Sequence, residues 1–240
     1  MLCLIAATLL IQTAQPAAGE DATPAQTETG TQAPAPLATD AASLIAEFDT
    51  AYETYGDLVA EVSARAARDR YIRTLLISRI SRTDLEPDVR SALISETEDT
   101  FDAVDQDNTA WALGVLDDFD FARLNADMPD IARKIAGLIQ HGDLAAQQRL
   151  LATVEPLALA GDFDGQSYAL LYDRVAMGEG RPQRYGSQFQ CVEGEQRPYE
   201  LEAPEAVDER RAAFGLEPLA EYEARNRALY GASCASSESE

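Results

Sequence analysis

The sequence predicts a mainly α-helical fold, a single-domain bundle or array of antiparallel helices that carries one small C-terminal β-hairpin. Two observations support this prediction. Apolar residues recur three and four positions apart along most of the chain from residue 41 to residue 232, which is the spacing that the buried face of a helix requires. One stretch after Pro182 changes to the alternation of apolar and polar residues that is typical of a strand.

Aspartates, prolines and glycines divide the apolar pattern into segments of helical length. Asp127 and Asp143 are expected to cap the starts of helices. Gly142 is expected in the left-handed position after a helix, and Pro156 is expected to bend the helix that contains it. The predicted helices span residues 41–56, 57–81, 87–118, 127–140, 143–161, 164–177, 204–214 and 219–230.

An acidic stretch interrupts the third of these segments. Asp102, Asp105, Asp107 and Asn108 resemble a calcium loop only superficially. An EF-hand loop that starts at Asp102 needs glycine at its sixth position and glutamate at its twelfth, but these positions hold Asp107 and Leu113. The stretch is therefore predicted to break the helix and to expose its carboxylates to solvent.

Asp69 and Arg73 lie four residues apart on the predicted helix 57–81, in the acid-first order that supports a helix. Because the polar face of this helix is rich in arginine, the two residues are predicted to form a surface ion pair. Exposed pairs of this kind contribute little to stability.

The predicted hairpin follows Pro182. Residues 185–192 alternate in polarity, a Glu-Gly-Glu-Gln turn follows, and residues 197–202 supply the second strand.

The N-terminal residues predict export. Residues 1–19 combine a short apolar run with small residues, in the pattern of a signal peptide. Residues 20–40 are rich in alanine, threonine and proline and are predicted to be a disordered linker, residues 41–232 the helical domain, and residues 233–240 a frayed acidic tail. We therefore expect a periplasmic or extracellular protein with no integral membrane segment after removal of the signal.

The charge of the chain excludes some classes of partner. The formal net charge of −23 repels phosphate groups, which argues against nucleic acids and anionic membrane surfaces as partners.

Without the signal peptide, two cysteines remain, Cys191 and Cys234. In an exported chain an even number favours a disulfide between them, whereas two unpaired thiols are the better interpretation if the chain is not exported.

Four polar segments of the C-terminal half stand out: QHGD at Gln140–Asp143, YALLYDR at Tyr168–Arg174, GRPQRYGSQ at Gly180–Gln188 and VDERRAAFGL at Val207–Leu216. They resemble the markers of a bacterial family of unknown function, family 6624, and the resemblance extends from Arg68 to Tyr222. The resemblance implies that a site lies among these segments and does not supply its chemistry.

The residues of these segments form the candidate site. His141, the only histidine, is a candidate general base, with Asp143 or Asp173 as the carboxylate that orients it. The alternative is a histidine at a helix C-terminus beside an N-capping aspartate. The candidate ligand-binding residues are Gln140, His141, Asp173, Arg174, Gln183, Tyr185 and Gln188. These side chains have a structural alternative as well, in which they satisfy the backbone of a hairpin that packs on helices.

Two functions remain open. We favour an exported binding or structural module of the cell envelope, with a polar pocket around His141 and the loop Gln183–Gln188, whose partner is a small polar ligand or an envelope protein. The alternative is a hydrolase-like enzyme that uses His141 as general base on a small polar or peptidic substrate. The enzyme also needs a nucleophile or a metal, but Ser187 lacks the second glycine of a nucleophile elbow, and one histidine with scattered aspartates does not specify a metal. No metal and no cofactor are therefore expected.

Overall fold

Residues 41–80, 84–193 and 195–230 are described in the computed structural model of the chain. The chain divides into two compact units. The smaller is Leu10–Gly56, and the larger contains Asp57–Glu240. The described part of the smaller unit is the N-terminal section of helix α1 (Ala41–Ile80). The signal peptide, linker and acidic tail that the sequence predicts lie outside the described residues.

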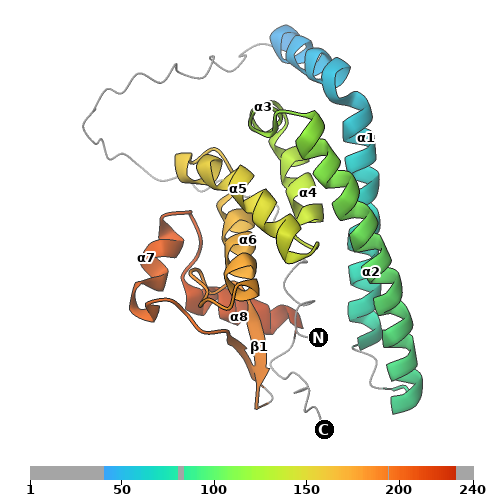
Figure 1. Ribbon diagram of the computed structural model, residues 1–240, viewed down its shortest axis with the longest axis vertical. Coiled ribbons are helices and arrows are strands. Elements are labelled where there is room, and N and C mark those ends of the chain that lie inside the picture. The colour runs from blue at the N-terminus through green and yellow to red at the C-terminus, as the bar shows by residue number, and fades with distance from the viewer. Residues whose placement is uncertain (1–40, 81–83, 194, 231–240) are drawn as a thin grey trace. The chain divides into compact units, whose positions relative to one another are not determined.

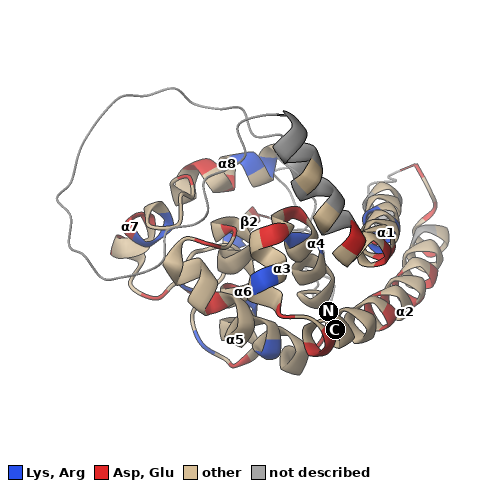
Figure 2. Ribbon diagram, turned by 90° about the horizontal axis from the view of Figure 1, so that it is seen from above, with Lys and Arg blue, Asp and Glu red and all other residues tan. Residues whose placement is uncertain are grey.

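The described residues are mainly helical, as the sequence predicts (Figure 1). The helices after α1 are α2 (Pro87–Asp118), α3 (Phe121–Asp127), α4 (Pro129–Ile139), α5 (Leu144–Ala160), α6 (Gly165–Gly178), α7 (Val207–Ala212) and α8 (Leu219–Tyr230), and a 3₁₀ turn, η2 (Pro204–Ala206), precedes α7. Acidic residues are spread over several of these helices (Figure 2). None of the described helices combines the length and the apolar composition that crossing a bilayer requires.

Within the larger unit, α1 and α2 run side by side in opposite directions (Figure 1). The guanidinium of Arg65 on α1 lies over the ring of Trp111 on α2. That of Arg73, further along α1, lies over Phe101, which is earlier in α2. Two arginines of α1 therefore stack on aromatic rings of α2.

Helix α4 lies at the centre of the packing and contacts α2, α3, α5 and α6. Its residues Ile135, Leu138 and Ile139 are almost fully buried, as are Leu150 of α5 and Leu171 of α6. Because α4 ends at Ile139 in this core, the turn that follows it is held close to α2: the Thr109 hydroxyl of α2 donates to the Leu138 carbonyl at 3.4 Å.

Both interruptions that were predicted for the first two helices are wrong. Helix α1 continues through Gly56 to Ile80, and α2 continues through Asp102–Asn108 to Asp118. One glycine costs a helix only about 1 kcal/mol, which packing can offset. Two acids of the stretch in α2 are paired with arginines of α1 and help to hold the helices together.

The predicted caps are partly confirmed. Asp143 accepts a hydrogen bond from the backbone N–H of Ala146 and caps α5, as predicted. Asp127 does not cap α4: it is the last residue of α3, a short helix that the sequence did not predict, and it pairs with Arg123. Gly142 does not adopt the predicted left-handed conformation.

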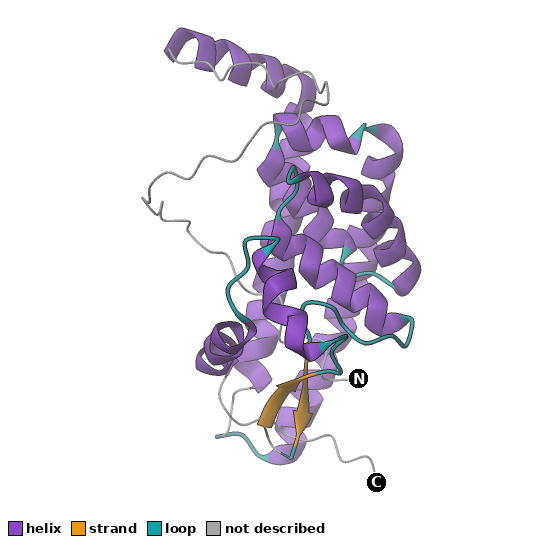
Figure 3. Ribbon diagram, turned by 90° about the vertical axis from the view of Figure 1, so that its left-hand side faces the viewer, coloured by secondary structure: helices purple, strands orange, loops and turns teal. Residues whose placement is uncertain are grey.

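The predicted hairpin is confirmed, but its turn is shorter than predicted: the second strand begins at Glu195, inside the predicted turn, and ends at Pro198 (Figure 3). Strand β1 (Phe189–Val192) pairs antiparallel with β2 (Glu195–Pro198), and Phe189 lies opposite Pro198. The first strand begins at Phe189 and not at Tyr185, because the backbone before it bonds to a side chain of α6 instead of to a second strand.

A glycine at the start of α6 provides a test of the packing. A Cβ at Gly165 would lie 2.3 Å from the carbonyl oxygen of Phe214, whereas a Cβ at Gly137, inside α4, would meet nothing within 4 Å. Gly165→Ala is expected to lower the free energy of unfolding by about 1–3 kcal/mol. The same substitution at Gly137 should raise it by about 0.5–1 kcal/mol, because alanine is the better helix former. Urea denaturation of both variants measures the difference, and equal effects would contradict the close approach of α6 to Phe214.

Candidate functional site

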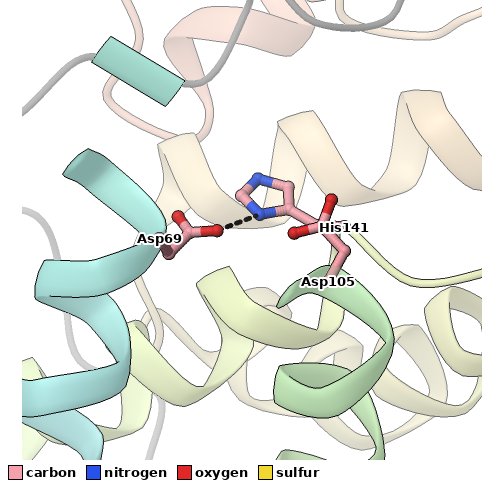
Figure 4. Close-up of side chains that lie close together, drawn as sticks. All are labelled: Asp69, Asp105 and His141. Carbon is pink, nitrogen blue, oxygen red and sulfur yellow. Dashed lines mark ion pairs between the residues drawn. The ribbon is translucent and has the colours of Figure 1, made fainter. Parts of the chain in front are cut away.

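Four charged or titratable side chains from three parts of the chain meet in the larger unit, and we name them the His141 cluster. Helix α1 supplies Asp69 and Arg73, α2 supplies Asp105, and the turn between α4 and α5 supplies His141. Figure 4 shows the imidazole between the two carboxylates. The side chains of Asp69 and Asp105 are 15% and 14% exposed, so the cluster is largely buried but reaches the surface.

The guanidinium of Arg73 connects the cluster. Its Nη2 donates to Asp69 Oδ1 at 2.9 Å and to Asp105 Oδ1 at 2.7 Å, and it makes a very short contact with Nδ1 of His141. Its Nε lies 3.1 Å from both carboxylate oxygens of Asp69. A single buried cation therefore joins α1, α2 and the α4–α5 turn, and the pair that was predicted to lie at the surface is buried instead.

Three polar side chains meet the imidazole of His141. Its Nδ1 lies against the guanidinium of Arg73 and 3.4 Å from Asp69 Oδ1. The side-chain amide of Gln140 lies 3.4 Å from Nε2. Among the described residues, the polar side chains bonded or ion-paired to His141 are Asp69, Arg73 and Gln140.

The environment separates the pKa values of the cluster. Burial lowers the pKa of His141 to about 4, and the positive charge of Arg73 acts in the same direction. Burial raises the pKa of Asp105 to about 6, although Arg73 opposes this. For Asp69 burial acts upwards as well, but hydrogen bonds with His141 and Arg73 outweigh it and lower the pKa to about 2. At neutral pH the imidazole is therefore neutral and Asp69 is ionised.

A second buried arginine belongs to the same electrostatic environment. Arg174 of α6 is 7% exposed, and burial, with a smaller contribution from the charge of Arg73, lowers its pKa to about 10. The negative charge of Asp105 acts in the opposite direction. Arg174 is thus the one residue of the predicted ligand-binding set in α6 whose charge acts on the His141 cluster.

Asp173, the neighbour of Arg174, serves a different purpose. Its carboxylate is fully buried and accepts hydrogen bonds from the backbone N–H groups of Arg184, Tyr185 and Ser187 at 2.7–3.0 Å. It therefore holds the loop before β1 in place and does not contact His141.

The glutamines of that loop are also bonded within the protein. The amide of Gln183 donates to the carbonyls of Gln188 and Tyr199 at 3.0 Å and accepts from the Gln188 backbone N–H at 2.9 Å. The Gln188 side chain donates to the Ser187 hydroxyl at 3.1 Å. All three residues are buried, and their contacts match the structural alternative for this loop.

The last polar segment, in α7, secures the loop from its other side. Arg210 donates to the Arg184 carbonyl at 2.8 Å, and Arg211 donates to the Tyr185 carbonyl at 2.6 Å. The ring of Tyr185 packs edge-on against Tyr168, Tyr172 and Phe214. Three of the four polar segments thus form one bonded unit around residues 183–188.

Residues 128–234 match the model of a family of unknown function, DUF6624. The match contains all four segments and confirms the resemblance that they indicate. It begins at Met128 and not at Arg68, where the resemblance was predicted to start. The DUF6624 segment therefore includes His141 and Arg174, whereas Asp69, Arg73 and Asp105 precede it. Neither the comparison with curated proteins nor the comparison with solved structures found a match.

The predicted site residues of the DUF6624 segment have three different roles in the structure. His141 belongs to the cluster, and Gln140 and Arg174 lie near it. Asp173, Gln183, Tyr185 and Gln188 hold the loop, and Asp143 caps α5. Sequence reasoning did not include Asp69, Arg73 and Asp105 in the site. A signal existed for two of them, because Asp69 and Arg73 continue the spacing of Leu58 and Val62, the buried face of α1.

Asp69, Asp105 and His141 also offer three possible metal ligands, whose donor atoms lie within 4.8 Å of one another. The residue types suit a divalent transition metal. However, Arg73 lies within hydrogen-bonding distance of all three donors. Its guanidinium supplies the positive charge that an ion would supply, so this ligand set does not fit a metal unless Arg73 moves away.

The cluster predicts an unusual pH dependence of stability. The pKa of Asp105 is raised in the folded state, so its contribution to stability is full below pH 3.8 and is lost as the pH rises through about 6. The pKa of His141 is lowered from 6.5 to about 4, so its contribution increases with pH over that range. The two contributions oppose each other between pH 4 and pH 6.

Asp105→Asn should therefore expose the contribution of His141. Between pH 4 and pH 7, the free energy of unfolding of this variant should rise relative to the wild type by about 2–3 kcal/mol, since one pKa unit corresponds to about 1.4 kcal/mol. Urea denaturation at a series of pH values measures it. Asp99→Asn, an exposed position on the same helix, is the control and should keep a constant difference from the wild type. A constant difference for Asp105→Asn would contradict the raised pKa.

Proposed function

We propose that the protein is an exported module of the cell envelope that acts by binding, and that the His141 cluster is the structural junction that fixes its helices. One observation carries this proposal: the guanidinium of Arg73 satisfies Asp69, Asp105 and His141 at once. A cluster whose members are all bonded to one another stabilises an arrangement of helices, whereas a reactive site needs a group that is available to a substrate.

The roles of the remaining polar residues support binding over catalysis. A general base works best with a pKa near the working pH, but that of His141 is lowered to about 4 and its Nδ1 faces a cation. Asp173, the carboxylate considered as a partner for it, is occupied by three backbone N–H groups. Ser187 is 1% exposed and its hydroxyl accepts from Gln188, so it is not available as a nucleophile.

The second candidate is a hydrolase-like enzyme that acts on a small polar or peptidic substrate, and one observation favours it. The pKa of Asp105 is raised by burial to about 6, which suits an acid–base group near neutral pH. In such an enzyme Asp105, and not His141, would transfer the proton. The stability of an Arg73 variant distinguishes this candidate from the first. Residues of a catalytic site often lower the stability of the folded protein, so replacing one of them often does not destabilise it.

Removal of Arg73 tests the structural junction. Arg73→Met leaves two largely buried carboxylates without their cation, and breaking a buried pair in this way costs about 3–5 kcal/mol of the free energy of unfolding. Arg68→Met is the matched control on the same helix, because the Arg68 side chain is 60% exposed and only 3.8 Å from Asp107 at its closest. Its effect should stay below about 1 kcal/mol. Unchanged or increased stability of Arg73→Met would favour the enzyme.

Export and the disulfide between Cys191 and Cys234 form the cellular part of the proposal. Cys191 lies on β1 and is half-buried, and Cys234 lies outside the described residues. The signal-like residues 1–19 and the even number of cysteines that remain support both.

Fractionation of bacteria that express the full chain should place the shortened protein in the periplasm. Mass spectrometry of a non-reduced digest should then find the Cys191 and Cys234 peptides linked. Recovery of an unshortened protein from the cytoplasm, with both thiols open to alkylation, would reject export and the disulfide together.

A further inference from the structure

A groove lies between α1 and α2, beside the His141 cluster but separate from it. It has a volume of about 460 Å³ and is lined by Asp57, Leu58 and Glu61 of α1, by Ala110, Trp111, Gly114, Val115 and Asp118 of α2, and by Phe119. From Glu61 to Asp69 the helix rises about 12 Å, at 1.5 Å per residue. The groove therefore offers a binding surface that does not use the cluster.

The lining combines an apolar floor with negative charge. Six of its nine residues are apolar or glycine, and the other three, Asp57, Glu61 and Asp118, are acidic. Glu61 is paired with Arg65 at 2.7 Å. Asp57 and Asp118 are exposed and have no ion-pair partner among the described residues. The groove thus presents two carboxylates that form no ion pair within the described part of the chain.

The end of α2 makes this charge less favourable still. The last turn of a helix carries a partial negative charge and favours basic side chains. In α2 this turn holds Asp117 and Asp118 and no basic residue. Asp117 is paired with Arg149 at 2.5 Å, which leaves Asp118 beside the negative helix end. A cation bound in the groove would relieve this repulsion.

The ring of Trp111 shows which kind of cation suits the groove. The guanidinium of Arg65 lies 4.8 Å from the centre of this ring and donates to Glu61 and Asp107. The protein thus already combines guanidinium, indole and carboxylate at this place. Guanidinium groups stack on aromatic rings and bind carboxylates with two donors, and the stem of arginine is apolar like the floor of the groove.

We propose that the groove between α1 and α2 binds an arginine side chain of a partner peptide, with Asp57 and Asp118 as the carboxylates that recognise its guanidinium. This inference rests on the proposed function as a binding module and names the chemistry of its ligand. The volume of the groove falls within the range of pockets that hold small ligands.

Trp111 is the only tryptophan of the chain, so its fluorescence and its indole N–H signal in NMR spectra report on this groove alone. The full chain is titrated with Nα-acetyl-arginine amide and, separately, with the citrulline analogue, which has nearly the same shape and no charge. Arginine amide should give a saturable shift with a dissociation constant on the order of 1–10 mM, as expected for one side chain. Citrulline amide should give a response at least tenfold weaker.

Two variants locate the response. Asp118→Asn should weaken binding of arginine amide at least tenfold and should leave the protein as stable as the wild type or more stable, because it removes a charge at the negative helix end. Asp117→Asn makes the same change of charge one residue away, outside the lining, and should change the affinity less than twofold.

Equal shifts with arginine and citrulline amides, or equal losses in the two variants, would overturn the proposal. A shift that depends on protein concentration alone would assign the groove to a second copy of the chain and would overturn it as well. The proposed function is tested separately by the stability of Arg73→Met and by fractionation, so failure of one proposal is distinguishable from failure of the other.

Discussion

The arrangement of the helices depends on how one buried guanidinium is satisfied. Arg73 is 4% exposed, and burial of an unpaired cation would cost several kcal/mol. Carboxylates on two helices and the only histidine, on a turn between two more, offset this cost together. Removing any one partner leaves the others incompletely bonded, so the position of α1 against α2 and the position of the α4–α5 turn are set by the same contact. This interdependence explains why an interface between helices contains charge where apolar residues would be simpler.

The loop before the hairpin is also held by one buried side chain, which is acidic where that of the cluster is basic. Here the buried group is the carboxyl of Asp173, whose oxygens accept hydrogen bonds from the backbone N–H groups of residues 184, 185 and 187. Arginines of α7 then bond to the carbonyls of Arg184 and Tyr185 on the other side of the loop. An irregular segment can be buried only if its backbone groups find partners, and here charged side chains supply most of them. Three of the four polar segments within the stretch that matches DUF6624 supply these contacts.

The sequence predicted the class of fold, most helix limits and the hairpin, because apolar spacing and the Asp143 cap are local signals. It failed where tertiary contacts decide. The acids of α2 look like a break in a helix when Arg65 and Arg73 are not known to face them, and Asp69 looks like half of a surface pair until α2 covers it. The candidate site was divided for the same reason: Asp173 and Arg174 are neighbours in sequence, yet one bonds to the loop and the other lies near the cluster. Sequence proximity of polar residues says little about which of them share an environment.

Gly142 is required for steric reasons in the turn between α4 and α5. A Cβ at this position would lie 2.5 Å from a methyl group of Thr109, so the turn can rest against α2 only because the residue has no side chain. The neighbouring imidazole reaches Arg73 from that position. The lack of a side chain at Gly142 therefore allows the α4–α5 turn to approach α2 closely. This close approach brings the imidazole of His141 within reach of Arg73. A survey of variants confined to ionisable residues would overlook Gly142, whose missing side chain lets the α4–α5 turn approach α2.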